Sequence, residues 1–309
     1  MLLQKIKYGF TRLRDELVGN EDYWHCRERA LSSEELTDTV YFLDMSRKGV
    51  YPGEMVDGIP IFYLDGKYRS VFYITIFNYG LGLLNRLLNG EDVSNAIQKV
   101  IKFTIETQSN DGSWISKFQE GAKHELIGGK TSGMTQGLGI SFLTRCFKIG
   151  YIKKKMCLTC IEKAKNAMLS NQCVSFFGEI KFIEEFCTPG NSIMNGSVFA
   201  LLGLYDYCKF IDDMSLFHNY ITDFEITLPK FNFMNWCYYD LKGTVCSKFY
   251  QQLHVDLMWV LYQVTNNEIF KKYAIRWEKG LNLFLIFVFI KAIQKMRNIK
   301  TMGMNYASN

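Results

Sequence analysis

The sequence predicts a mainly α-helical protein, an incomplete α/α toroid of about four helical hairpins with β-hairpin insertions on its active face. Three observations lead to this fold class. Polar residues recur at a nearly constant spacing, each spacing covers two helical patterns of different character, and segments with turn signals separate the helical pairs. A period longer than one helix indicates a repeated supersecondary unit. Helical hairpins that repeat and curve can close into a toroid.

The repeat is marked by four polar residues, each followed by an apolar helical pattern. Their successive spacings along the chain are 58, 59 and 59 positions, and the residues are Asn78, Gln136, Asn195 and His254. Each of them by itself could be a helix cap or a buried polar residue that is fully hydrogen-bonded. Four at equivalent places favour a shared cavity, so we predict that all four bind a ligand at the N-terminal ends of the inner helices.

Each repeat predicts an inner helix and an outer helix. The inner helices are apolar nearly all round, as expected of buried helices, and we place them near 74–88, 134–147, 192–209 and 251–264. The outer helices have one polar face, and we place them near 93–107, 154–170, 214–228 and 268–279. Glycine is frequent in the inner helices, which suggests close backbone approach at a crowded centre.

The connections that precede the inner helices carry hairpin signals. Residues 57–72 alternate around Asp65-Gly66, residues 172–186 alternate around Gly178, and residues 232–250 turn at Lys242-Gly243. Because all of these connections precede inner helices, a toroid would place them on one face. Insertions on one face of a repeat array commonly form its binding site.

The composition fits one main domain. The chain has 309 residues, of which 48% are apolar and 22% charged, and no Pro- or Ser-rich linker divides it. We therefore predict an N-terminal helical extension at 1–49, the main helical domain at 50–290 and a tail at 291–309. A net charge of +5 favours an acidic partner. Nucleic acid is not expected, because zinc-finger spacing, RNP-like boxes and basic-aromatic stripes are missing.

The nine cysteines predict neither a metal site nor a disulfide framework. A chain of this size can build a core without disulfides, and the count is odd. Cys157-x-x-Cys160 lacks a second ligand pair, so zinc is not expected there. The sequence shows no signal peptide and no run long enough to span a bilayer. We therefore expect a cytoplasmic protein with no cofactor.

Residues 2–17 place apolar side chains on one helical face and basic ones elsewhere. This amphipathic pattern is compatible with docking onto the domain or with lying on a membrane surface. In the second case the chain would be peripheral to the inner face of the membrane.

Three stretches then resemble one family. Residues 132–137 read Ser-Gly-Met-Thr-Gln-Gly, residues 184–189 read Glu-Glu-Phe-Cys-Thr-Pro, and residues 239–242 read Tyr-Asp-Leu-Lys. Supporting matches are Met-Asn-Gly at 194–196, Gly-Leu-Tyr-Asp at 203–206, Tyr250 with His254, and Arg-Trp at 276–277. Together, in this order, they resemble the C-terminal catalytic domain of the D-glucuronyl 5-epimerases, which act on heparosan-type glycans.

The resemblance implies roles for particular residues. Tyr239 and Tyr250 match tyrosines required for catalysis, and Glu185 matches the carboxylate beside a further catalytic tyrosine. The position of that tyrosine is occupied by Phe186, which has no ionisable group and leaves activity in doubt. Near His254, Gln251 replaces a histidine of the family, and Asp256 an asparagine. Catalytic residues are thus expected at 185, 239 and 250, and substrate-binding residues at 78, 136, 186, 195 and 254.

Such residues suit the chemistry that the resemblance implies. Inversion at carbon 5 of glucuronic acid, giving iduronic acid, removes a proton α to a carboxylate and returns one to the opposite face. That step needs two acid/base groups and donors aimed at the developing charge. The expected partner is an acidic polysaccharide such as a capsule-type glycan. Contact of residues 1–17 with a membrane or a biosynthetic complex, and a homodimer, stay open.

Other functions share parts of this pattern. A polysaccharide lyase on the same fold would make the same first step and then expel the oxygen on carbon 4, and fold alone does not separate the two outcomes. A degenerate epimerase that only binds glycan is compatible with Phe186. A terpene cyclase is disfavoured because the sequence has no aspartate cluster for a diphosphate.

Overall fold

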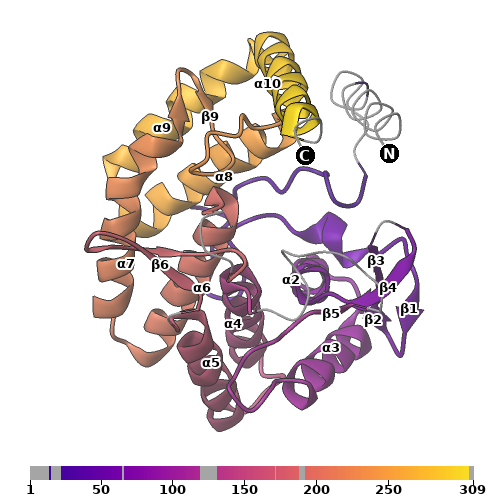
Figure 1. The fold of residues 1–309 in the computed structure, drawn as a ribbon. Coiled ribbons are helices and arrows are strands. Elements are labelled where there is room, and N and C mark those ends of the chain that lie inside the picture. The colour runs from indigo at the N-terminus through magenta and orange to yellow at the C-terminus, as the bar shows by residue number, and fades with distance from the viewer. Residues whose placement is uncertain are drawn as a thin grey trace. The chain divides into compact units, whose positions relative to one another are not determined.

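The computed structural model describes residue 14 and residues 22–64, 66–118, 131–170, 172–187 and 192–305, with side chains up to residue 294 (Figure 1). The described chain is mainly helical, with short antiparallel hairpins between the helices. It divides into two compact units. One unit comprises residues 28–230, and the other combines residues 231–309 with the N-terminal residues up to Arg27.

Three helical hairpins form most of the unit of residues 28–230. The first helices of these pairs are α2 (Tyr73–Leu88), α4 (Gly133–Lys148) and α6 (Met194–Ile211). The second helices are α3 (Ser94–Glu106), α5 (Lys154–Met168) and α7 (Ser215–Thr227). A 3-10 turn, η1 (Ser46–Gly49), packs against α2, and a second one, η2 (Leu228–Phe231), ends the unit. The first helices are buried over most of their length, whereas the second helices bury one face.

Helix α4 packs against both α2 and α6. At the α4–α6 contact the backbones touch through two glycines: a Cβ atom on Gly203 would lie 2.3 Å from the Cα atom of Gly137. Any larger residue at either position would push the helices apart. The predicted close approach at the glycine-rich inner helices is confirmed here.

Short hairpins precede α2 and α6 in this unit. Strands β1 (Met55–Val56) and β2 (Ile59–Pro60) form one pair, and β3 (Phe62–Leu64), β4 (Tyr68–Val71) and β5 (Lys117–Phe118) form a three-stranded sheet. Before α6, β6 (Val174–Phe177) pairs with β7 (Ile180–Ile183) around Gly178, whose φ of +68° favours glycine. The hairpins predicted at 57–72 and 172–186 are confirmed.

Two buried ion pairs lie in the same unit. Arg145 on α4 donates to Asp206 on α6 at 2.6 Å, and its Nε atom donates to the carbonyl of Val40. Lys48 pairs with Glu28 at 3.0 Å, and both side chains are buried. Removing one partner of a buried pair leaves an uncompensated charge, which is strongly destabilising. Residues 28–49, predicted as part of an N-terminal extension, thus contribute to the core of this unit.

The second unit contains one helical hairpin, one β-hairpin and a long terminal helix. Its helices are α8 (Lys248–Thr265), α9 (Glu268–Leu281) and α10 (Phe284–Asn305), and its strands are β8 (Asn232–Phe233) and β9 (Trp236–Cys237). Trp236 stacks on Phe287 of α10 with ring centroids 4.5 Å apart. The N-terminal segment joins this unit because Arg27 forms a bidentate ion pair with Asp256 of α8.

All eight helices expected from the repeat are present, with ends within three residues of the predicted ones. Helix α10 was not predicted as a helix, because its first residues read only as a short apolar run. Among the described helices, none combines the length and the apolar composition that crossing a bilayer requires. The amphipathic pattern at 2–17 lies outside the described residues, apart from Arg14.

Candidate functional site

The segment that carries Glu185 is held firmly by main-chain hydrogen bonds. It follows β7, and the amide of Glu184 donates to the carbonyl of Cys173. The amide of Gly133, at the start of α4, donates to the carbonyl of Glu184, and the amide of Cys187 donates to the carbonyl of Thr131. The segment therefore crosses the N-terminal end of α4 in a fixed position.

The two adjacent carboxyl groups of this segment differ in their surroundings. The Glu184 carboxylate accepts hydrogen bonds from the amide and the hydroxyl of Ser192, both at 2.7 Å. Glu185 is buried, and its Oε2 atom has no hydrogen-bond partner among the described residues. Burial, with a smaller contribution from the charge of Glu184, raises the pKa of Glu185 to about 8. A carboxyl group that titrates near neutral pH suits proton transfer.

Helix α6 makes room for the Glu185 side chain at Gly196. A Cβ atom on Gly196 would lie 2.2 Å from the Cβ atom of Glu185 and 2.5 Å from its Oε2 atom. The carboxyl group of Glu185 therefore lies directly on the first turn of α6, next to Asn195. Phe186 is also buried, and it offers no hydroxyl group to this site.

A second group of predicted site residues lies in the other unit. Tyr239 follows β9 in a turn in which Asp240 accepts hydrogen bonds from the amides of Lys242 and Thr244. Tyr250 lies in the first turn of α8, whose N-cap is Ser247. The rings of Tyr239 and Tyr250 are 4.6 Å apart at an interplanar angle of 57°.

His254 lies one helical turn beyond Tyr250, with ring centroids 6.4 Å apart. The structure thus brings together the three residues Tyr239, Tyr250 and His254, which the sequence placed at one site. It places the other predicted site residues, Glu185, Phe186, Asn78, Gln136 and Asn195, in the unit of residues 28–230.

The four repeated polar residues are all buried, but they do not occupy equivalent helix positions. Counted from the N-cap, Gln136 is the fourth residue, Asn195 the second, Asn78 the sixth and His254 the seventh. Asn78 Oδ1, Asn195 Oδ1 and His254 Nε2 have no hydrogen-bond partner among the described residues. Buried polar atoms without partners are rare and call for an explanation, and a bound ligand is one.

Gln136 differs from these three because its side chain is satisfied within the protein. It accepts from the amide of Trp114 and donates to the carbonyl of the same residue. Gln251, also the fourth residue after its N-cap, accepts from the amide of Cys237 and donates to the carbonyl of Trp277. The structural counterpart of Gln136 in the last repeat is therefore Gln251 and not His254, and both glutamines accept a hydrogen bond from an amide in the segment before their helix.

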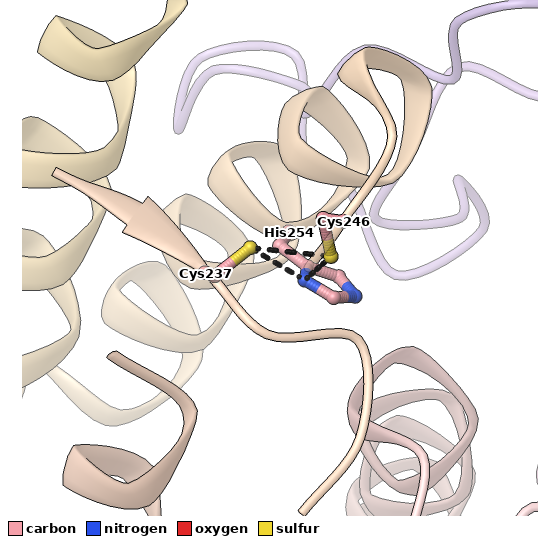
Figure 2. Close-up of side chains that lie close together, drawn as sticks. All are labelled: Cys237, Cys246 and His254. Atoms are coloured by element: carbon pink, nitrogen blue, oxygen red, sulfur yellow. Dashed lines mark hydrogen bonds between the residues drawn. The ribbon is translucent and has the colours of Figure 1, made fainter. Parts of the chain in front are cut away.

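A cluster that sequence inspection missed surrounds His254. Figure 2 shows the sulfur atoms of Cys237 and Cys246 next to the Nδ1 atom of the His254 ring. Cys237 Sγ lies 3.0 Å and Cys246 Sγ 3.5 Å from Nδ1, and the two sulfur atoms are 3.5 Å apart. All three residues are buried, and they are the one group of potential metal ligands found in the described part of the chain.

The pKa values of the two thiols in this cluster are shifted in opposite directions. Burial opposes ionisation of Cys246, but the hydrogen bond from Cys237 and the charge of His254 outweigh it and lower the pKa of Cys246 to about 6. Burial raises the pKa of Cys237 well above its usual value. The spacing of Cys237, Cys246 and His254 along the chain resembles no metal-binding motif. The cluster can therefore be recognised only in the folded structure.

Cys157 and Cys160, which have the one metal-like spacing in the sequence, form no such cluster. The Sγ atom of Cys157 donates to the carbonyl of Leu143, and burial together with Cys160 raises the pKa of Cys157 to about 12. Both residues are buried against the core and stay protonated. They therefore behave as small apolar side chains.

The structure contains a disulfide between Cys173 and Cys187. Cys187 lies two residues after Glu185, so this bond ties the Glu185 segment to the start of the β6–β7 hairpin. This bond contradicts the expectation that the cysteines form no disulfide framework.

Sequence similarity links this chain to known proteins. The family model described as D-glucuronyl C5-epimerase C-terminus matches residues 108–279. The D-glucuronyl C5-epimerase of Caenorhabditis elegans is 27% identical over 217 residues, which cover 60% of this chain and 35% of that protein. An uncharacterized protein of Methanocaldococcus jannaschii is 31% identical over 91 residues, covering 28% of this chain and 29% of that protein. The chain thus aligns with about a third of each of these relatives. The family match includes the Glu185 segment, the Tyr239–Tyr250 pair and His254, and the chain belongs to the D-glucuronyl C5-epimerase C-terminal family.

Proposed function

We propose that the protein is a uronate 5-epimerase that converts glucuronic acid to iduronic acid within a heparosan-like polysaccharide. The observation that carries this proposal is the buried carboxyl group of Glu185, which has an unpartnered oxygen and a pKa of about 8. Family membership supports uronate epimerisation in general. The heparosan-like substrate rests on the resemblance of the motifs, and capsule-type glycans are the candidates that we would test first.

The reaction requires two acid/base groups on opposite faces of the sugar. In the proposed mechanism, the ionised form of Glu185 removes the proton from carbon 5, and a phenol of the Tyr239–Tyr250 pair returns one to the other face. The opposite direction uses the same groups with their roles exchanged. Carboxyl and phenol groups with tuned pKa values can perform both steps. That these groups act on one sugar follows from the predicted α/α toroid and is part of the proposal.

The developing charge on the substrate carboxylate also needs partners. Asn78 Oδ1 and Asn195 Oδ1 are acceptors without partners among the described residues, so hydroxyls of the uronate would donate to them, and His254 Nε2, when it carries the ring proton, would donate to the carboxylate. Gln136 is not proposed as a substrate ligand, because the oxygen and the nitrogen of its side-chain amide are both hydrogen-bonded to the main chain of Trp114. Phe186 would contact the sugar only through its ring.

Analysis of the product distinguishes this proposal from its rivals. Incubated with a panel of glucuronate polymers, the protein should form iduronate residues in at least one of them, detected by NMR, without shortening the chains. Unsaturated ends that absorb ultraviolet light would identify a lyase. If neither product forms with any polymer, but Phe186→Tyr forms iduronate, the chain is a degenerate epimerase that lacks one hydroxyl group. If Phe186→Tyr also folds and is inactive, the proposal is wrong.

A further inference from the structure

We propose that Cys237, Cys246 and His254 bind a zinc ion through their two sulfur atoms and the Nδ1 atom of the ring. The three ligands come from the end of β9, the loop before α8, and the second turn of α8 (Figure 2). Their atoms lie within 4.8 Å of one another, and all three residues are buried. The proposal does not depend on the reaction proposed above.

The distances fit one face of a zinc tetrahedron. With zinc–sulfur bonds of 2.3 Å and zinc–nitrogen bonds near 2.05 Å, ideal ligand separations are about 3.8 Å between sulfurs and about 3.6 Å between sulfur and nitrogen. The observed separations are 3.5 Å between the sulfurs and 3.0 and 3.5 Å from sulfur to Nδ1. A zinc ion therefore needs only a small outward shift of Cys237.

The donor set selects the metal. Two thiolates and an imidazole suit zinc, whereas calcium and magnesium require oxygen ligands. Zinc binds the thiolate form of cysteine, so binding displaces the thiol protons of its two cysteine ligands, and no redox step is involved. Within the described residues, the cluster has no fourth cysteine, histidine or carboxylate. The amide oxygen of Gln251 lies 2.9 Å from Cys237 Sγ, but it already accepts the amide proton of Cys237. A water molecule or an anion is therefore expected in the fourth position.

The metal would have two consequences for the candidate site. With Nδ1 bound to zinc, the ring proton must be on Nε2, which is the buried atom without a partner. His254 would then present a fixed hydrogen-bond donor. The ion would also join the loop that carries Tyr239, two residues after Cys237, to the helix that carries Tyr250. We therefore assign zinc a positioning role for these two rings.

Two cysteines this close could instead form a disulfide. The amide of Cys246 donates to the carbonyl of Cys237, so their backbones are already paired. The buried histidine nitrogen 3.0 Å from Cys237 Sγ favours the metal, because a disulfide would leave Nδ1 facing a sulfur that is neither donor nor ligand.

The test measures metal content and coordination in the full-length chain. Protein produced with zinc in the medium and purified without chelators should hold about one zinc ion per chain. X-ray absorption at the zinc edge should show two sulfur neighbours and one imidazole nitrogen. Replacing zinc by cobalt(II) should give the charge-transfer absorption of two thiolates. These measurements need no variant and do not depend on catalytic activity.

Variants then locate the site. Cys246→Ser should lose the zinc and the cobalt absorption. Cys157→Ser should keep both, because its hydroxyl can retain the hydrogen bond to Leu143 and Cys157 is not a ligand. The proposal is wrong if the purified wild-type chain holds no zinc after incubation with it, if its zinc has a different ligand set, or if mass spectrometry finds a Cys237–Cys246 disulfide. Zinc retained by a folded Cys246→Ser variant would also overturn it.

Discussion

Two neighbouring glutamates show how local surroundings assign different roles to the same residue type. Glu184 accepts two hydrogen bonds from Ser192 and closes the loop before α6. Glu185 is directed against Gly196, where burial keeps its carboxyl group protonated up to a pKa of about 8. Glu184, the structural carboxylate, and Glu185, the candidate acid/base group, are therefore adjacent in sequence, but their carboxyl groups lie in different surroundings.

The raised pKa of Glu185 predicts a pH-dependent cost to folding. Its value is about 8 in the folded chain against a reference of 4.5, so the folded state binds the proton more tightly than the unfolded state. Stability is therefore lost as pH rises from 4.5 through 8. Glu185→Gln should match the wild type at pH 4 and exceed its free energy of unfolding by up to a few kcal/mol above pH 8.

Denaturant unfolding at several pH values checks this prediction. Glu184→Gln serves as the control and should be destabilised at neutral pH, because it disturbs the hydrogen bonds from Ser192. A stability difference between Glu185→Gln and the wild type that does not change with pH would show that Glu185 titrates normally.

At the residue scale, the sequence identified the family motifs but not what each residue does. Asp206 and Gly203, in the Gly-Leu-Tyr-Asp motif, form an ion pair and a helix contact. Gln136 anchors Trp114. A motif match cannot separate such roles from catalysis, because both require a particular residue at a particular place. The hydrogen-bond partners in the structure separate them.

At the scale of elements, helical periodicity was sufficient to place the helices. The alternation of fully buried and half-buried helices follows directly from the apolar pattern, so α2 to α9 were predicted closely. The pattern gave no information on α10, whose polar second half lacks a clear face. The spacing of 59 residues also matched His254 with Gln136, because spacing alone cannot show which residue of α8 reaches the preceding loop.

The Cys173–Cys187 bond belongs to this scale, because it closes the β6–β7 hairpin and the Glu185 segment into one loop. The two cysteines are 14 residues apart. In the chain-entropy model, a disulfide that closes a loop of this length stabilises the folded state by about 3 kcal/mol. The double variant Cys173→Ser/Cys187→Ser should therefore lose about 2–4 kcal/mol of stability.

Chemical denaturation of this double variant, and of the wild type with and without reductant, measures the effect. Cys26→Ser is the matched control, because Cys26 is a buried cysteine outside the disulfide and its substitution should not alter the response to reductant. Two free thiols at positions 173 and 187 in the oxidised protein, with stability insensitive to reductant, would contradict the prediction.

At the scale of the whole molecule, the predicted site residues fall in two units. Residues 28–230 carry Glu185, Asn78 and Asn195, and the other unit carries the Tyr239–Tyr250 pair and His254. The sequence could predict each group, because each depends on local motifs and helix patterns. Ring closure of the predicted toroid is not a local property of the chain, so it stays a prediction and is part of the proposed function.

Deuterium uptake at carbon 5 tests the central claim most directly, because it detects the proton transfer itself. In heavy water with a glucuronate polymer, the wild type should exchange the proton at carbon 5 without cleaving the chain. Tyr250→Phe and Glu185→Gln should each slow exchange by about 10² to 10⁴. Tyr262→Phe, on the same helix as Tyr250 but outside the candidate site, should exchange at the wild-type rate. Exchange that persists unchanged in folded Tyr250→Phe and Glu185→Gln, or that is missing from the wild type with every polymer, would contradict the account.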